Sequence, residues 1–89
     1  MYSKRSLAII RVRRMERIFD ILSANKDRVN QNAVLMGLFK RLVAYYGGGK
    51  WLSDYTLDEK GLLPKSLKRG VLSEDGLYDL IVEIESTLK

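Results

Sequence analysis

The sequence predicts a small all-α domain, and three observations support this. Apolar residues recur every three or four positions in three long stretches, as they do on one face of a helix. No stretch alternates apolar and polar residues convincingly, as a half-buried strand would. The 89 residues, 46% hydrophobic and 30% charged, suit one globular domain. We therefore expect a single domain over residues 1–89, an antiparallel helical hairpin with a C-terminal helix that completes a three-helix bundle.

The first helix is expected over residues 5–24. Its apolar stripe has spacings of four, three, four and three residues: Ala8, Val12, Met15, Phe19 and Leu22. The opposite side is charged: Arg13, Glu16, Arg17 and Asp20. Leu7, Ile10 and Ile21 fall off the stripe, so this helix carries more apolar surface than one partner helix covers. Either its first turns fray, or this surface meets another protein or a second copy.

A polar, Asn-rich stretch over residues 23–32 separates this helix from a second one, expected over residues 29–47. The stripe of the second helix is Leu35, Leu38, Leu42 and Tyr45. Three glycines, residues 47–49, end it. Residues 50–72 are expected to form an irregular connection that wraps across the hairpin, with one helical turn near residues 52–56 and a short helix over residues 64–69.

The last helix is the clearest element. Ser73 is expected to be its N-cap, and Glu74 and Asp75 follow in the first turn, where acidic residues suit the helix dipole. Leu72 and Leu77 have the spacing of a hydrophobic staple. The buried stripe is Leu77, Leu80, Ile81, Ile84 and Leu88. We expect it to pack into the groove of the hairpin.

The composition disfavours an enzyme. The chain has no Cys and no His, so thiolate chemistry, the commonest general base and the commonest zinc ligand are absent. Asp54, Asp58, Glu59, Glu74 and Asp75 match no metal-binding loop, and we expect structural roles for them, Asp54 pairing with Lys68 or Arg69. We expect no cofactor and no metal. No targeting segment and no membrane-spanning apolar run is visible, which predicts a cytoplasmic protein.

The Tyr–Trp corner, residues 45–55, invites two interpretations. Tyr45, Tyr46, Trp51 and Tyr55 lie within eleven residues, on both sides of the glycine triplet. A large aromatic ring buries much area in a small domain, so we expect Trp51 to plug a packed corner. A small-molecule pocket lined by the rings is the alternative.

The formal net charge of +5 lies entirely in the first thirty residues. Arg13, Arg14 and Arg17 share one arc of the first helix, which makes them candidates for binding phosphates. Against this, Glu16 and Asp20 border the arc and offer ion pairs. Arg11 lies near the edge of the apolar stripe, where its stem can pack while its head group reaches an acid.

Several strings of the sequence resemble those of a known family. They are "RME" at 14–16, "LVAYY" at 42–46, Trp51, Asp54, and "LPKSLKRGVLSEDGLYDL" at 63–80. They resemble a bacterial family of short proteins described only as a domain of unknown function, over about residues 14–83. The resemblance implies a small bacterial, cytoplasmic, helical protein and supplies no catalytic residues.

Two functions of different classes follow from these observations. The favoured one is a non-enzymatic helical interaction module that forms a homodimer or binds a protein partner through Leu7, Ile10 and Ile21. The alternative is a nucleic-acid-binding accessory protein that uses Arg13, Arg14 and Arg17. The sequence itself names no partner.

Overall fold

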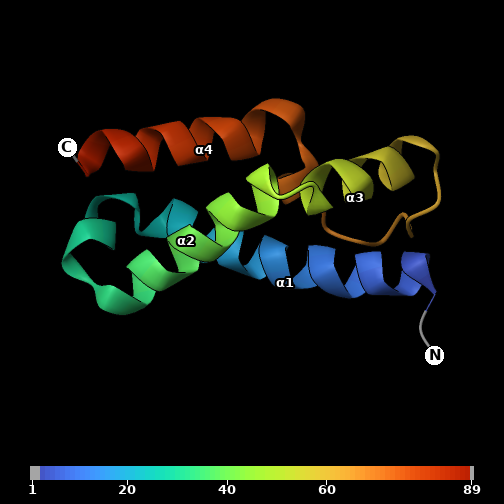
Figure 1. Cartoon of the computed structure of the whole chain (residues 1–89), viewed down its shortest axis with the longest axis horizontal. Helices are drawn as coiled ribbons and strands as arrows, with labels where there is room; N and C mark the ends of the chain where they lie inside the picture. The colour runs from blue at the N-terminus through green and yellow to red at the C-terminus, as the bar shows by residue number, and fades with distance from the viewer. Residues whose placement is uncertain (1–2, 89) are drawn as a thin grey trace.

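The computed structural model describes residues 3–88 and contains helices and turns but no strand in that range (Figure 1). The all-α prediction is confirmed. The elements are four α-helices, α1 (Lys4–Ala24), α2 (Ala33–Gly47), α3 (Lys50–Glu59) and α4 (Glu74–Thr87), and two 3-10 helices, η1 (Lys26–Gln31) and η2 (Gly70–Leu72). The prediction of a three-helix bundle therefore omitted one α-helix, α3.

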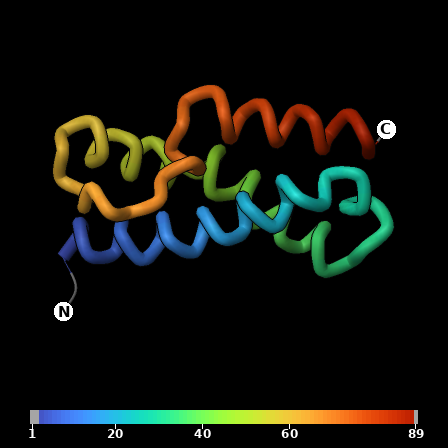
Figure 2. The backbone as a smooth tube through the Cα atoms, turned by 180° about the vertical axis from the view of Figure 1, so that it is seen from behind, coloured from blue at the N-terminus to red at the C-terminus, as the bar shows by residue number. Residues whose placement is uncertain are grey.

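Helix α1 begins where the Ser3 hydroxyl accepts a hydrogen bond from the backbone N–H of Ser6, at 3.1 Å. Its predicted apolar stripe faces the core, except that Phe19 is only half-buried and Ile18 is buried beside it. Helix α2 runs antiparallel to α1 and crosses it (Figures 1 and 2).

Helix α2 starts at Ala33 rather than near residue 29. The Asn32 side chain accepts from the backbone N–H groups of Val34 and Leu35, at 2.9 and 3.1 Å, and so sets the first turn. The residues before it form η1, which buries Val29. The inward face of α2 carries Leu35, Phe39, Leu42 and Tyr45, with Leu38 half-buried.

Helix α3 is the main correction to the predicted irregular connection. Gly49 has φ +92°, a conformation that favours glycine, and it lets the chain end α2 at Gly47 and start a new helix at Lys50, after only two residues. The buried residues of α3 are Trp51 and Asp54. Because one of these is an acid, apolar periodicity did not reveal the helix.

Residues 60–69 leave the end of α3 and run back alongside α1 (Figures 1 and 2). The short helix expected over residues 64–69 is absent, and one turn closes with a bond from Leu67 N–H to the Pro64 carbonyl at 3.1 Å. The Arg69 guanidinium donates to the carbonyls of Pro64 and Leu67 and to Asp58, which holds the segment in this non-helical shape.

Helix α4 begins as predicted. The Ser73 hydroxyl accepts from the backbone N–H of Gly76 at 3.3 Å, and Leu72 and Leu77 are both buried at this end. Its packing differs from the prediction, because α4 lies mainly on η1, η2 and α2 and does not fill a groove between α1 and α2. Helices α1 and α4 therefore lie at opposite edges of the molecule in Figures 1 and 2.

Candidate interaction surface

The outer side of α1 is an exposed face with apolar and cationic residues. Leu7, Ile10 and Ile21 keep 45%, 41% and 37% of their surface exposed. Arg14 and Arg17, both exposed, lie between them at spacings of three and four residues along the helix. This outer face consists of Leu7, Ile10, Arg14, Arg17 and Ile21. Because such spacings follow one side of a helix, these side chains form one line.

The inner side of α1 is held in place by a buried polar network. Asp54 of α3 is fully buried and accepts bonds from Arg11 Nε at 3.0 Å, Arg11 Nη2 at 2.5 Å and the Tyr45 hydroxyl at 2.8 Å. The network joins α1, α2 and α3. The hydrogen bond to Asp54 raises the pKa of Arg11, and burial, with the bond to Asp54, raises the pKa of Tyr45.

This network corrects one sequence-based pairing and confirms another. Asp54 pairs with Arg11, not with Lys68 or Arg69, which pair instead with Asp20 and Asp58. The expectation that the Arg11 head group reaches an acid is confirmed. Asp54 lies 43 positions from Arg11 in the chain, so local spacing held no signal for the partner.

Glu16 is a second inward-facing charge, and its predicted place on the solvent side of α1 is wrong. Its Oε1 accepts from the backbone N–H of Val71 at 2.7 Å, which attaches η2 to α1. A Cβ atom on Gly70 would lie 3.0 Å from Glu16 Oε2, so glycine permits this close approach. In the sequence, Glu16 lies on the same charged side of the helix as Arg13 and Arg17, so helical periodicity predicts that it is exposed. The sequence therefore did not reveal its bond to Val71.

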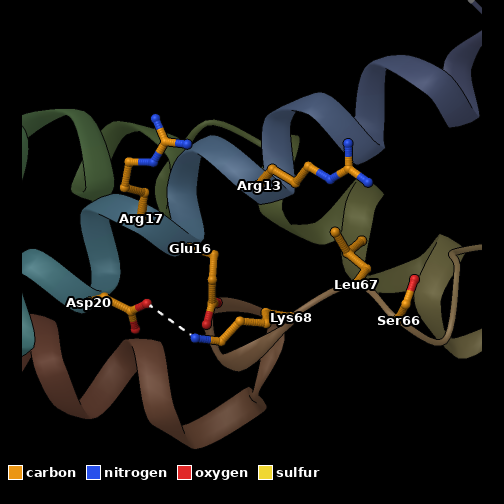
Figure 3. A pocket seen from close by; sticks show the side chains of 7 residues that line it. All are labelled: Arg13, Glu16, Arg17, Asp20, Ser66, Leu67 and Lys68. Carbon is orange, nitrogen blue, oxygen red and sulfur yellow. Dashed lines mark ion pairs between the residues drawn. The ribbon is translucent and has the colours of Figure 1, made fainter.

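The candidate phosphate-binding arginines do not form a purely cationic site. Arg13 and Arg17 line a groove of about 370 Å³ between α1 and residues 66–68, whereas Arg14 is not part of its lining. Glu16, Asp20 and Lys68 line the same groove, and Lys68 Nζ lies 3.7 Å from Asp20 Oδ2. Figure 3 shows both arginines pointing away from Glu16 and from the Asp20–Lys68 pair. A phosphate entering here would meet two carboxylates.

A comparison with protein families places the chain. The model of a family described as a domain of unknown function, DUF4298, matches residues 12–89. The chain belongs to the DUF4298 family. Neither the curated proteins nor the solved structures include a match to it. The matched range contains Asp54, Tyr45, Glu16 and Val71, whereas Leu7, Ile10 and Arg11 precede it.

In this DUF4298 domain the Tyr–Trp corner is packed. Trp51 is buried, and its Nε1–H donates to the Val71 carbonyl at 2.9 Å. Its ring stacks on Tyr55, with centroids 5.0 Å apart, and meets Tyr46 at 5.1 Å. The predicted burial of Trp51 is confirmed.

Residues 3–88 contain no group of three or more His, Cys, Asp or Glu side chains placed to hold a metal ion. None of the helices in this range combines the length and the apolar character that crossing a membrane requires.

Proposed function

We propose that this DUF4298 domain is a non-enzymatic helical interaction module that self-associates through the outer face of α1. The observation that supports this most is the exposure of Leu7, Ile10 and Ile21 along one line of the longest helix. Apolar side chains gathered in this way favour contact with another protein surface over contact with water.

The anchoring of α1 also supports the proposal. The Arg11–Asp54 pair and the Glu16–Val71 bond fix the inner side of the helix, so its outer side keeps one shape. A surface that is ordered before binding loses less conformational entropy when it associates.

The nucleic-acid alternative is less well supported by this geometry. Arg13 and Arg17 share their groove with Glu16 and Asp20, and Lys68 is already near Asp20. Carboxylates at these positions repel phosphates and compete for the same cations.

Molar mass measured by light scattering over a range of concentrations tests the proposal. The wild-type mass is expected to rise above that of one chain, and Ile10→Glu is expected to suppress the rise because it places a charge in the apolar line. Val34→Glu is the matched control, since Val34 is a 72% exposed apolar residue on α2. A wild-type mass of one chain at all concentrations, or association unchanged by Ile10→Glu, would refute the proposal.

A further inference from the structure

The outer face of α1 is poorly suited to bind a copy of itself. An antiparallel pair of α1 helices that sets Leu7 of each copy against Ile21 of the other also brings the two Arg14 side chains together. A parallel pair sets Arg14 against Arg14 and Arg17 against Arg17. Like charges in contact oppose association, so the complementary surface must be acidic.

A groove beside this face also calls for an acidic partner surface. It lies between the first half of α1 and α3, with a volume of about 810 Å³. These two elements lie at the right of Figure 1. Leu7 and Leu52, the latter 59% exposed, supply apolar surface, and Lys4, Lys50 and Lys60 supply positive charge. Arg11 also lines the groove, but its charge is already paired with Asp54, so it is not counted. Among the described residues, no Asp or Glu lines it. The groove therefore suits an acidic segment with apolar residues of its own.

Helix α4 has that chemistry on its outward side. Residues 74–87 contain five acidic residues and no basic one. Tyr78 and Val82 are 53% and 45% exposed, and the acids Asp75, Asp79 and Glu85 are exposed around them. Glu83 is already paired with Lys26 at 2.9 Å, so it is not counted here.

The two surfaces also match in length. Lys50 is the first residue of α3 and Lys60 is its C-cap, ten positions later, and Asp75 and Glu85 are ten positions apart on α4. At 1.5 Å per residue each pair spans about 15 Å. In both cases the apolar residues lie between the charged ends, Leu52 on one side and Tyr78 and Val82 on the other. Helices that bind in grooves show this arrangement of apolar anchors and flanking charges.

We propose that the groove between α1 and α3 binds the outward face of α4 from a second copy of this chain. This inference rests on the proposed function, self-association. It identifies the α4 face of a second copy as the surface that Leu7 contacts. Because α1 and α4 lie at opposite edges of the molecule, the contact joins unlike surfaces. Such a contact leaves a groove and an α4 face free at the two ends, so it builds chains or rings instead of a closed pair.

Two single variants and their mixture test this contact. Leu52→Glu places an acid opposite the acidic helix, and Val82→Lys places a cation opposite the basic groove. Each is expected to raise the concentration needed for half-association by roughly tenfold or more. An equimolar mixture is expected to form dimers but not longer chains, because the intact groove of Val82→Lys can bind the intact α4 face of Leu52→Glu while the two remaining surfaces are both impaired. Leu62→Glu is the control, since Leu62 is exposed and outside the groove lining.

The outcomes separate this inference from the proposed function. If Leu52→Glu and Val82→Lys leave association unchanged while Ile10→Glu abolishes it, the α4 contact is wrong and the α1 surface stands. If the two variants abolish association but their mixture forms no dimers, the head-to-tail contact is overturned. Circular dichroism and thermal midpoints matching the wild type show that each variant is folded.

Discussion

Glu16 Oε1 accepts the backbone N–H of Val71 at 2.7 Å, across 55 positions of the chain. The bond attaches the middle residue of η2 to the middle of α1, and Gly70 has no side chain that would crowd the Glu16 carboxylate. Both α4 and the Trp51 corner depend on this point, since Val71 also supplies the carbonyl that Trp51 binds.

We predict that Glu16→Ala lowers the free energy of unfolding by about 1 to 3 kcal/mol, because it leaves a buried N–H without an acceptor. Gly70→Ala should cost about 1 kcal/mol by crowding the fixed carboxylate. The two effects should not add, because in Glu16→Ala the added methyl group has room. Urea unfolding of both single variants and the double variant checks this, and strict additivity would contradict it.

The Arg11–Asp54–Tyr45 network leads to a second prediction. Arg11→Met should destabilise the fold more than Tyr45→Phe, which should cost about 1 kcal/mol, since only the former leaves Asp54 buried without a cation. Arg11→Met combined with Asp54→Leu should recover part of the loss, because an apolar pair carries no desolvation penalty. Equal losses in Arg11→Met and Tyr45→Phe would show that the charge pairing is unimportant.

Trp51 gives a third prediction. Trp51→Ala should cost roughly 3 to 5 kcal/mol, a large part of the stability of a small domain. Trp51→Phe should cost less, because Phe keeps a ring against Tyr55 and loses the bond to the Val71 carbonyl. Thermal unfolding compares the two variants. In the wild type, iodide should quench Trp fluorescence weakly, and quenching as strong as that of free indole would contradict the burial.

The outcome shows what local sequence patterns can and cannot reveal. Helical periodicity and the Ser73 cap were predictable because each depends on neighbours a few residues away. The burial of Trp51 was predictable because a small domain buries its large aromatic rings. Asp54 and Glu16 were misassigned because their partners, Arg11 and Val71, are distant in the chain. Helix α3 was predicted only as one turn near residues 52–56 for the same reason: its inward face holds an acid whose burial is compensated by Arg11 of α1 and Tyr45 of α2.

A fourth prediction concerns alkaline pH. Burial raises the pKa of Tyr45 in the folded state above its value of 10.0 in the unfolded chain, so folding favours the protonated phenol. The contribution of the protonated Tyr45 to the free energy of unfolding is fully present below pH about 10. As the pH rises from there toward the folded pKa, the free energy of unfolding falls by up to about 1.4 kcal/mol per pH unit. Lysines titrate in the same range, so the measurement is the difference between wild type and Tyr45→Phe. Urea midpoints that converge above pH about 10 would agree with the prediction, and a constant difference would contradict it.

The fifth prediction is weak DNA binding that salt abolishes. If four of Lys4, Arg5, Arg13, Arg14 and Arg17 contacted phosphates, the slope of log K against log salt would be about −3.6. Raising the salt fourfold would then weaken binding by about 150-fold. A titration of labelled duplex and single-stranded DNA at two salt concentrations measures this slope.

In the same titration, Asp20→Asn is expected to strengthen DNA binding, whereas the arginine variants are expected to weaken it. Asp20 lines the groove that holds Arg13 and Arg17, and it lies 3.7 Å from Lys68. Its neutralisation removes one repulsion and releases one cation, so low-salt binding should strengthen, whereas Arg13→Ala combined with Arg17→Ala should weaken it. Dissociation constants tighter than about 1 µM at about 150 mM salt, lost in the double arginine variant, would instead make the arginines the functional site.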